Sequence, residues 1–292
     1  MRVAFLVPAP DYPEAWDWAF DGEAAGLVAA GLDVETRPWT EANDLSGFDI
    51  ILPLLVWGYN RRIAEWYALL DRLEAERLPV VNPAPLLRWN SDKCYLAELD
   101  AKGVPTVATR LTDALTMRDL DAARAAFETD TLVIKPPVSA AADGTFKIGP
   151  DDGVPVSVVG HRMLIQPWMP AIASEGEYSL MFFGGDYSHA IIKTPKPGDF
   201  RVQPHLGGVE RPCAPPAGSK ALAQAALAAA PADAAYARVD MIADAEGQLR
   251  IMELELIEPS LWIEHSPDAG AAYAAAIVSA AARFVEQPLA DR

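Results

Sequence analysis

The sequence predicts an α/β protein with α+β lobes, in which an open parallel sheet comes first. Short apolar runs alternate with amphipathic segments in the first part of the chain, a pattern typical of βαβ units. Two hairpin patterns follow in the last part, and 292 residues exceed one domain of roughly 150 residues. A hydrophobic content of 51% supplies a sizeable core and excludes a disordered chain.

The first block of elements is an alternation of strands and helices. The stretch 48–55 is nearly all apolar, as expected for a strand whose two faces are both covered. The helix that follows places Ile63, Trp66 and Leu70 on one face, at the three-and-four spacing of a buried stripe. The expected strands are 3–7, 33–36, 48–55 and 78–81, and the expected helices are 15–31 and the segment 63–73.

The middle block is marked by helix-capping signals. Asn90 or Ser91 is expected to cap a helix, and Thr116 with Asp119 has the T-x-x-D pattern of a capping box. The segment 138–158 is rich in Ala, Gly and Asp without a clear period, so loops are expected there. The other expected elements are strands at 131–135 and 162–167 and a helix at 116–127.

The last block is built from two hairpins. Glu246-Gly247 is the expected turn of the second hairpin. The expected strand pairs are 177–183 with 187–193, and 236–242 with 249–256; helices are expected at 219–230 and 270–285. The three blocks correspond to three expected domains, which are 1–86, 87–166 and 167–292.

Charge and cysteine content exclude several classes of protein. The net charge is 24 − 41 = −17, and no Lys/Arg cluster offsets it, so no nucleic-acid or membrane partner is expected. No apolar run approaches the roughly 20 residues that span a bilayer, and the start lacks a signal-peptide pattern. Cys94 and Cys213 are too few for a disulfide scaffold or a zinc site, which indicates the cytoplasm. A homodimer is left open.

The strongest chemical signal is an acidic hairpin near the end of the chain. Alternation places Glu253 and Glu255 on one face of their strand. With a two-residue turn at 246–247, Asp240 lies opposite Glu253. Like charges ~4 Å apart repel by roughly 4 kcal/mol per pair at an effective dielectric constant of about 20, so the acids are expected to be protonated or neutralised.

Divalent cations are one way to neutralise these acids. Oxygen ligands without His or Cys favour Mg²⁺ or Mn²⁺. Two alternatives remain: the carboxylates form a solvated acidic face, or Arg238 and Arg250 pair with them. Two isolated lysines favour a bound Mg-nucleotide, because Lys93 lies in the first turn of a helix and Lys135 ends an apolar strand. P-loop, G-x-G-x-x-G, H-E-x-x-H and G-x-S-x-G motifs are absent from the sequence.

These residues resemble the ATP-grasp enzymes, on the glutathione-synthetase-like side of that superfamily, over most of the chain. The resemblance implies a pre-ATP-grasp domain with an open sheet, followed by two lobes that enclose ATP. The matching stretches are Asn90-Ser91-Asp92-Lys93, Leu132-Val133-Ile134-Lys135-Pro136, Gln166-Pro167-Trp168-Met169, Glu175-Gly176-Glu177, Arg238-Val239-Asp240 and Glu253-Leu254-Glu255.

The resemblance also implies roles for single residues: lysines on the phosphates, a hinge on adenine, an acid on ribose and a lid loop over the phosphates. The implied nucleotide-binding residues are Lys93, Lys135, Ser139, Gln166, Trp168, Met169 and Glu177. The implied ligands of two Mg²⁺ ions, with Mn²⁺ as an alternative, are Asp240, Glu253 and Glu255. The residues expected near the γ-phosphate and the substrates are Lys193, Arg201 and His205.

The implied chemistry is transfer of the γ-phosphoryl group of ATP to a small-molecule carboxylate, followed by attack of an amine on the acyl phosphate. The stretch 198–203 with Gly207-Gly208 resembles a subgroup that includes the enzyme closing the ring in cycloserine biosynthesis. Three alternatives follow: ligation of an acid to an amine, intramolecular cyclisation by the same activation, and nucleotide binding without turnover.

Overall fold

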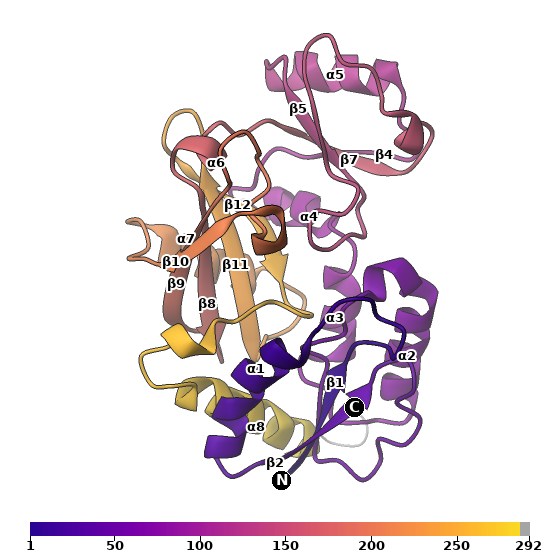
Figure 1. The fold of residues 1–292 in the computed structure, drawn as a ribbon, viewed down its shortest axis with the longest axis vertical. Helices are drawn as coiled ribbons and strands as arrows, with labels where there is room; N and C mark the ends of the chain where they lie inside the picture. The colour runs from indigo at the N-terminus through magenta and orange to yellow at the C-terminus, as the bar shows by residue number, and fades with distance from the viewer. Residues whose placement is uncertain (287–292) are drawn as a thin grey trace.

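The computed structural model describes residues 1–286, which form three β-sheets with helices packed against them (Figure 1). The first part comprises β1 (Arg2–Val7), α1 (Asp17–Ala29), β2 (Asp33–Pro38), β3 (Ile50–Leu52), η1 (Tyr59–Arg62), α2 (Ile63–Ala75), α3 (Ala84–Asn90) and α4 (Tyr95–Ala101). Its sheet is parallel, in the order β2-β1-β3. Residues of β1 alternate between two cores, with Val3 and Phe5 in one and Ala4 and Leu6 in the other.

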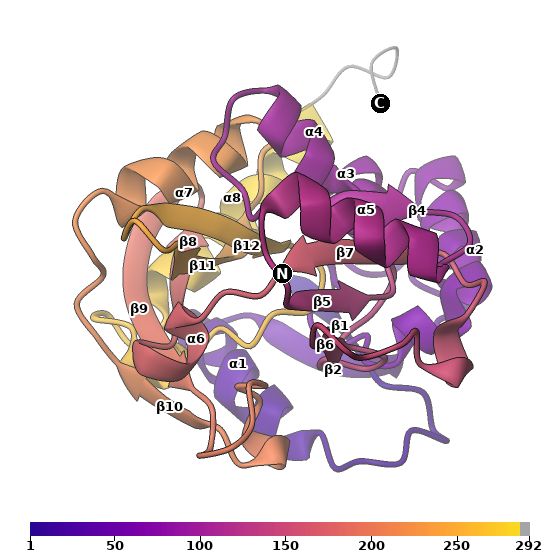
Figure 2. The ribbon, with the colours of Figure 1, turned by 90° about the horizontal axis from the view of Figure 1, so that it is seen from above.

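The central lobe is a four-stranded antiparallel sheet, in the order β4-β7-β5-β6, at the top of Figure 1. It comprises β4 (Arg110–Thr112), α5 (Met117–Phe127), β5 (Leu132–Lys135), β6 (Phe146–Ile148), η2 (Val156–Val158) and β7 (Met163–Pro167). Helix α5 packs on β5 and β7, as the view from above shows (Figure 2). The capping box predicted at Thr116 and Asp119 starts this helix.

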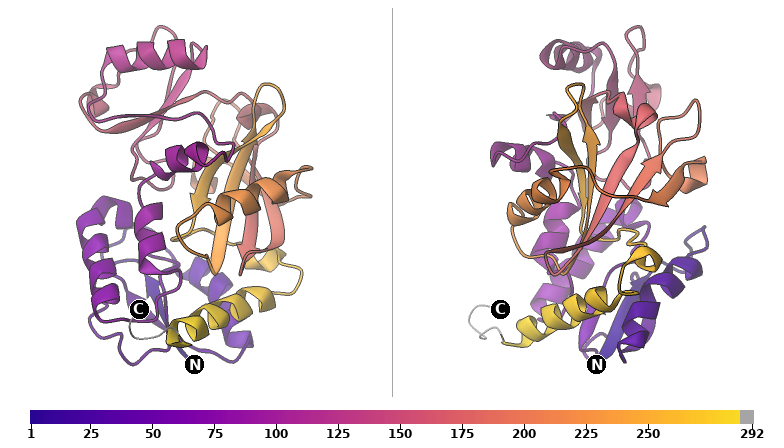
Figure 3. Two further views of the ribbon diagram at one scale, coloured as in Figure 1. Left: turned by 180° about the vertical axis from the view of Figure 1, so that it is seen from behind. Right: turned by 90° about the vertical axis from the view of Figure 1, so that its left-hand side faces the viewer.

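The C-terminal lobe is a five-stranded antiparallel sheet, in the order β10-β9-β8-β11-β12. It comprises α6 (Ala171–Ser174), β8 (Glu177–Phe183), β9 (Asp186–Thr194), η3 (Pro204–Leu206), β10 (Val209–Pro212), α7 (Ser219–Ala228), β11 (Tyr236–Ala243), β12 (Leu249–Glu255), η4 (Ile263–His265) and α8 (Ala271–Glu286). Seen from behind, α7 covers one face of this sheet and α8 runs along the bottom (Figure 3). Within residues 1–286, each helix is too short or too polar to cross a lipid bilayer.

Three elements of the first half differ from the predictions. The strand predicted at 48–55 is shorter, since β3 covers only Ile50–Leu52. The segment 78–81 forms no strand, because Val80 makes only an isolated β-bridge to Ile51. The predicted helix cap at Asn90 or Ser91 is wrong. Asn90 is the last residue of α3, and its buried side chain binds the backbone of β12 instead. Helix α3 is short and apolar and begins directly after Pro83, so the sequence shows no helical period that would have predicted it.

Two further differences lie in the lobes. The predicted loop at 138–158 contains β6, which pairs with β5, and a short 3₁₀ turn. The last hairpin has a three-residue loop closed by Asp244 and Gln248 instead of a two-residue turn. An extra residue in β12 compensates for the longer loop, because the pairing shifts by one between Asp240 and Met241. The predicted pairing of Asp240 with Glu253 is therefore confirmed.

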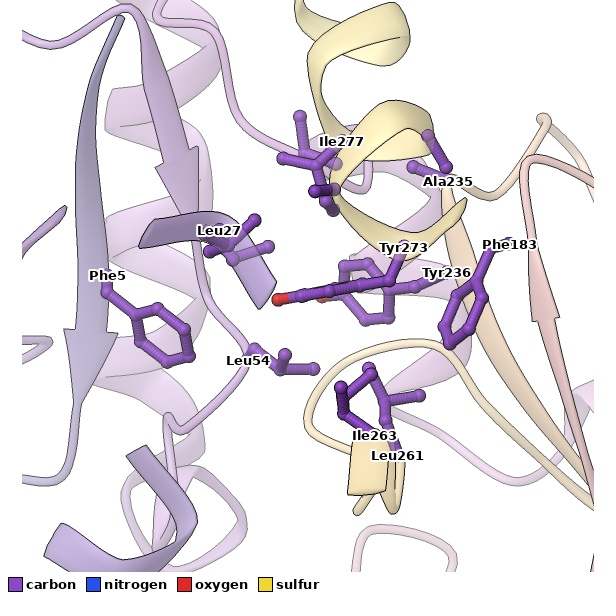
Figure 4. Close-up of a cluster of buried hydrophobic side chains, with 14 of the residues drawn as sticks. Phe5, Leu27, Leu54, Phe183, Ala235, Tyr236, Leu261, Ile263, Tyr273 and Ile277 are labelled. Atoms are coloured by element: carbon purple, nitrogen blue, oxygen red, sulfur yellow. The ribbon is translucent and has the colours of Figure 1, made fainter. Parts of the chain in front are cut away.

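The first and last parts of the chain share one hydrophobic core (Figure 4). Phe5 of β1 faces Tyr273 and Ile277 of α8 across this cluster. Helices α1 and α8 approach closely, since a Cβ atom at Gly26 would lie 3.3 Å from the carbonyl oxygen of Gly270. The N-terminal sheet is thus covered on one face by a helix from the other end of the described chain.

Side chains from the first half pair with the outer edge of β12. Asn82 donates to the carbonyl of Leu256 at 2.9 Å. Asn90 donates to the carbonyl of Leu254 and accepts from the N–H of Leu256, each at 2.9 Å. The Tyr95 hydroxyl bonds both backbone groups of Leu254 at 2.9 Å. An edge strand normally leaves these groups unpaired, so here side chains take the place of a neighbouring strand.

This edge pairing predicts a large effect of one substitution. Asn82 is fully buried and also bonds the backbone of Ala235 and Tyr236. We expect Asn82→Ala to lower the free energy of unfolding in urea by about 3 kcal/mol or more, because it leaves three buried backbone groups without partners. The control is Asn43→Ala at an exposed position, with an expected change within about 0.5 kcal/mol. Equal stability of the two variants would contradict the role of Asn82.

Candidate active site

The acidic row lies on the C-terminal sheet, on one face of β11 and β12. Asp240 is directly opposite Glu253, and Glu255 follows two residues later on the same face. Asp240 is only 2% exposed. Ser179 of the neighbouring β8 donates its hydroxyl to Asp240 at 2.5 Å. The row therefore lies across β11 and β12, and β8 supports Asp240 at a place with little access for water.

Two lysines from outside this sheet reach the row. Lys135, at the end of β5, forms an ion pair with Glu253, with 2.6 Å between Nζ and Oε1. Lys93, in the turn between α3 and α4, lies 3.7 Å from the other carboxylate oxygen. Their side chains are only 8% and 12% exposed. The pair of Lys135 and Glu253 joins the central lobe to the C-terminal lobe.

Two further cations come from the C-terminal sheet itself. Lys193 of β9 forms an ion pair with Glu177 and lies 3.4 Å from Asp240. Arg238 of β11 donates to Asp240 through Nε and a terminal nitrogen, each at 3.0 Å, and forms a second ion pair with Glu255. Each of the three acids of the row is thus paired with at least one cation.

We name these eight side chains the charge cluster. Its acids are Glu177, Asp240, Glu253 and Glu255, and its bases are Lys93, Lys135, Lys193 and Arg238. Of the alternatives left open by the sequence, pairing with Arg238 is observed, whereas Arg250 binds Asp244 instead. The acids are therefore neutralised by protein cations in this structure, as one of the expected alternatives describes.

The donor set of the charge cluster suits Mg²⁺, because it consists of carboxylate oxygens on neighbouring strands. Within residues 1–286, however, no group of three or more His, Cys, Asp or Glu side chains is already arranged around a common metal position. The cations stand between the acids. A metal ion at this place has to displace Arg238 or a lysine from its carboxylate.

Burial and the neighbouring cations act on the pKa values in opposite directions. Burial by itself raises the pKa of Asp240, but the charges of Arg238 and Lys193 outweigh it and hold this pKa below the usual range. Burial likewise raises the pKa of Glu253, but the charges of Lys135 and Lys93, together with the hydrogen bond from Lys135, outweigh it and lower this pKa. Both acids are therefore ionised near neutral pH, as ligands of a divalent cation must be.

Burial also raises the pKa of Glu255, and the pKa of Glu177 is shifted in the same direction. Burial raises the pKa of Glu177 to about 7 although Lys193 opposes the shift. The position depends on Gly176, whose φ is +105° and whose Cβ would lie 2.6 Å from the carbonyl oxygen of Lys193. Only glycine lets β8 begin so close to β9, and this contact sets Glu177 against the ammonium group.

Glu258 is a candidate residue that the sequence pattern did not reveal. It lies three residues after Glu255, beyond the end of β12, so strand alternation no longer applies to it. Burial raises its pKa to about 8, and the charge of Glu255 adds to the shift. Its carboxyl group extends the acidic row toward the N-terminal part, where burial raises the pKa of Tyr12 and Tyr59 and the charge of Glu258 adds to the shift.

The expected adenine hinge lies where β7 leaves the central sheet. Gln166 is buried, donates its side-chain amide to Thr109 at 2.9 Å, and lies opposite Val133 in the pairing of β7 with β5. The Trp168 ring carries the ammonium group of Lys147 at 3.8 Å from its centroid. Met169 packs in the apolar cluster between the central and C-terminal lobes.

The expected lid loop connects β5 to β6 and contacts two other parts of the molecule. Lys93 donates its ammonium group to the carbonyl of Ser139 in this loop. Arg61 of η1 forms an ion pair of 3.2 Å with Asp143 at the tip. The loop therefore lies over the charge cluster and against the N-terminal part.

Arg201 and His205 are not part of the charge cluster. Arg201 pairs with Asp199 at 2.9 Å, and His205 is exposed on η3. Within residues 1–286, neither side chain forms a hydrogen bond or ion pair with the cluster. Phe200 contacts Trp168 edge-on, with ring centroids 5.7 Å apart, so this segment lies beside the hinge.

Comparisons with known proteins support the fold and show the family. A family model described as the N-terminal domain of the D-cycloserine synthetase DcsG matches residues 4–82. The cycloserine biosynthesis protein DcsG of Streptomyces lavendulae is 31% identical over 300 residues, covering 94% of this chain and 97% of that protein. The crystal structure of D-cycloserine synthetase DcsG has a TM-score of 0.84 at 27% identity, covering 97% of this chain and 100% of that one.

A more distant structure shares the fold. The D-alanine–D-alanine ligase of Bacillus anthracis complexed with ATP has a TM-score of 0.67 at 16% identity, covering 97% of this chain and 98% of that one. Fold and site define this protein as an ATP-grasp ligase, which activates a carboxylate with ATP for attack by an amine-type nucleophile. Within that class, the chain belongs to the family of the D-cycloserine synthetase DcsG. ATP and Mg²⁺ are the cofactors of this class.

The position of Lys135 predicts a defect in nucleotide binding. We expect Lys135→Ala to weaken ATP binding at least tenfold, because a charged phosphate contact contributes about 1.5–3 kcal/mol. Titration calorimetry measures the affinity, and Lys220→Ala on the surface of α7 is the control. A folded Lys135→Ala protein with unchanged ATP affinity would exclude the phosphate contact.

The raised pKa of Glu177 predicts a pH dependence of ATP binding. If the carboxylate accepts hydrogen bonds from ribose, binding holds it ionised and lowers its pKa from about 7. Affinity should then rise with pH between about 6 and about 8, because the free protein gives up a proton on binding in this range. Glu177→Gln has no such proton and should lose this part of the slope. ATP itself titrates in the same pH range, so the measured quantity is the difference between the slopes of ATP affinity against pH in the wild-type protein and in Glu177→Gln. Equal slopes would count against the ribose contact.

Proposed function

We propose that the charge cluster is the phosphoryl-transfer site of this ligase. The observation that carries the proposal is the contact between Glu253 of the C-terminal lobe and Lys135 of the central lobe, at 2.6 Å, with Lys93 beside it. A carboxylate that faces lysines across two lobes suits phosphate groups and their divalent cations, which enter between them. Ser139, next to Lys93, belongs to the lid loop over the same phosphates.

Asp240, Glu253 and Glu255 are the proposed ligands of two Mg²⁺ ions. Bound there, the ions polarise the phosphoryl oxygens and neutralise charge as the phosphoryl group transfers. The cluster contains as many bases as acids, so a nucleotide whose charge is balanced by two divalent ions leaves the site nearly neutral. Mn²⁺ accepts the same oxygen ligands and is the proposed substitute.

Arg238 and Lys193 have a second task in this proposal. Once metal ions occupy the carboxylates, both cations lose a partner and can bind a new anion. The planar guanidinium of Arg238 matches a carboxylate or a phosphoryl group with two hydrogen bonds. We assign to it the contact with the acyl phosphate, and to Lys193 a contact with the γ-phosphate.

The hinge and Glu177 are proposed to hold the nucleoside. Adenine lies between the lobes beside Trp168 and Met169, with the backbone of Gln166 as a further contact. The N–H group of Met169 has no hydrogen-bond partner within residues 1–286, so it is available to a ring nitrogen. Glu177 lies beyond α6 on the same connection and is proposed to accept the ribose hydroxyls.

The small-molecule acid and amine are proposed to bind between the C-terminal lobe (167–292) and the N-terminal domain (1–86), with the central lobe (87–166) closing on ATP. Arg201 is the proposed contact for the substrate acid, because its guanidinium fork matches a carboxylate. His205, four residues later, is proposed to orient the nucleophile or take its proton.

Intramolecular cyclisation is the second candidate function. It is favoured by the 31% identity to the cycloserine biosynthesis protein DcsG over nearly the whole chain. The same charge cluster would activate the acid, and the nucleophile would then belong to the same molecule.

One experiment tests both candidates. Purified protein with ATP and Mg²⁺ is incubated with a panel of small amino acids and amino-acid derivatives, singly and in pairs, and phosphate release is measured. Release that needs two organic reactants supports ligation, and release with one that yields a dehydrated product supports cyclisation. ADP formation without any consumption of the organic acid would argue against carboxylate activation.

The proposed metal-binding role of Glu253 predicts that its substitution abolishes turnover. We expect Glu253→Gln to abolish phosphate release, because the amide removes the charge that binds the metal and pairs with Lys135. The control is Glu246→Gln in the loop between β11 and β12, with unchanged activity expected. If Glu253→Gln keeps wild-type rates at limiting Mg²⁺, the metal assignment is wrong.

A further inference from the structure

An aromatic ring packs against the guanidinium group of Arg238. Its guanidinium carbon lies 5.4 Å from the centroid of Trp262, within the range of a cation–π contact. The indole N–H of Trp262 donates to Glu210 of β10 at 2.9 Å. Trp262 has φ +43° and ψ +52°, a left-handed conformation that is rare for a bulky residue. The ring is thus held at its nitrogen, and its backbone is held in an unfavourable conformation.

The residue before it is held on both sides by buried titratable groups. The backbone N–H of Leu261 donates to Glu23 of α1 at 3.4 Å. Its carbonyl oxygen lies 2.9 Å from Nε2 of His189 on β9, which donates to it. The other nitrogen of His189 lies 2.9 Å from the hydroxyl of Ser188. The Leu261 side chain lies in the core shared with α8 (Figure 4).

Two features of this arrangement, the buried carboxyl group of Glu23 and the backbone conformation of Trp262, cost free energy when each is considered alone. Glu23 is 6% exposed, and one of its carboxyl oxygens is buried without a hydrogen-bond partner in the described residues. A buried unsatisfied oxygen and a strained backbone persist where surrounding structure enforces them, often at functional sites. The steps proposed above for phosphoryl transfer use neither Glu23, His189 nor Trp262.

We propose that Trp262 is a positioning residue for Arg238, and that Glu23 and His189 position Trp262 by holding the backbone of Leu261. This inference rests on the proposed role of Arg238 in phosphoryl transfer. When Mg²⁺ takes Asp240 and Glu255, the guanidinium loses both anionic partners. The ring of Trp262 remains as a partner and keeps the guanidinium facing the reacting groups.

The same ring strengthens the competition between Arg238 and Mg²⁺ for the carboxylates. Holding the guanidinium close to Asp240 and Glu255 opposes entry of a metal ion. Loss of the ring should therefore slow the reaction without weakening metal binding. General damage to the site would lower both the reaction rate and the affinity for Mg²⁺. A variant with a lower rate and unchanged Mg²⁺ affinity therefore distinguishes loss of positioning from general damage.

The test compares Trp262→Leu with Trp262→Phe. We expect Trp262→Leu to lower kcat about tenfold while the KM for ATP stays nearly constant, because a desolvated cation–π contact is lost. Trp262→Phe keeps a ring and should recover most of kcat. The affinity for Mg²⁺ with ADP, measured by calorimetry, should be unchanged or tighter in Trp262→Leu. Trp18→Leu, at a position that is 66% exposed, is the control.

Two outcomes would overturn the inference: wild-type kcat in Trp262→Leu, or a loss of kcat and Mg²⁺ affinity together with no recovery in Trp262→Phe. Arg238→Met, measured in parallel, separates this from the proposed function. Full activity of Arg238→Met would refute the role of the arginine itself. An inactive Arg238→Met beside a fully active Trp262→Leu would refute only the positioning by Trp262.

The contribution of the buried pair is tested at Glu23. Glu23→Gln keeps an oxygen that accepts from Leu261 and should have nearly wild-type kcat, whereas Glu23→Ala should lower kcat in the manner of Trp262→Leu. His189→Phe keeps the ring shape and loses the donor, so it provides a second variant if Glu23→Ala does not fold. Wild-type kcat in the folded variants that lack the contact to Leu261 would contradict the positioning role.

Discussion

The outer edge of β12 has no neighbouring strand, and three polar side chains occupy it instead. Asn82, Asn90 and Tyr95 bond the backbone of residues 254–256 from segments that come much earlier in the sequence. At Ile251 the backbone of residues 105–107 does the same. Because side chains alternate along a strand, a slip of β12 by one residue would turn its carboxylates to the opposite face. This edge pairing therefore fixes the face on which the acids lie.

The charge cluster follows from this register. Acids on two strands of the C-terminal lobe meet bases from the central lobe, from the turn after α3 and from their own sheet. The cations pair with the acids, so no carboxylate of the cluster is buried without a partner. In the proposed function, the same pairing makes metal binding an exchange, in which Mg²⁺ replaces protein cations that then become available to the phosphates. The side chains that pair with one another in this structure are thus the same ones that are proposed to bind the metal ions and the phosphates.

Sequence periodicity could predict the acids because they follow the simple rule of the pleated strand. It placed Asp240 opposite Glu253 even though the loop is longer than expected, since the bulge in β12 compensates for it. It could not predict the partner of each acid, because the pairing of Lys135 with Glu253 depends on how two lobes face each other. Glu258 was missed for a related reason, since it lies beyond the end of the strand where no period applies.

The polar residues of the first half show the same limit. Asparagine is a residue type favoured at the N-cap of helices, yet Asn90 ends α3 and bonds an edge strand more than 160 positions away in the sequence. A capping residue and a residue that pairs with a distant backbone use the same donor and acceptor groups. At Thr116 and Asp119 both partners are local, and there the sequence pattern was sufficient.

The core shared by β1 and α8 has a consequence for folding. Val3 and Ala281 belong to the same buried cluster, so one face of the N-terminal sheet is covered partly by α1 and partly by residues synthesised near the end. Contacts between such distant segments require closure of a very long loop and slow the folding reaction. On the ribosome, α1 can cover its share of this face early, whereas the apolar side chains that pack against α8 stay exposed until α8 emerges, and during that interval they are open to aggregation.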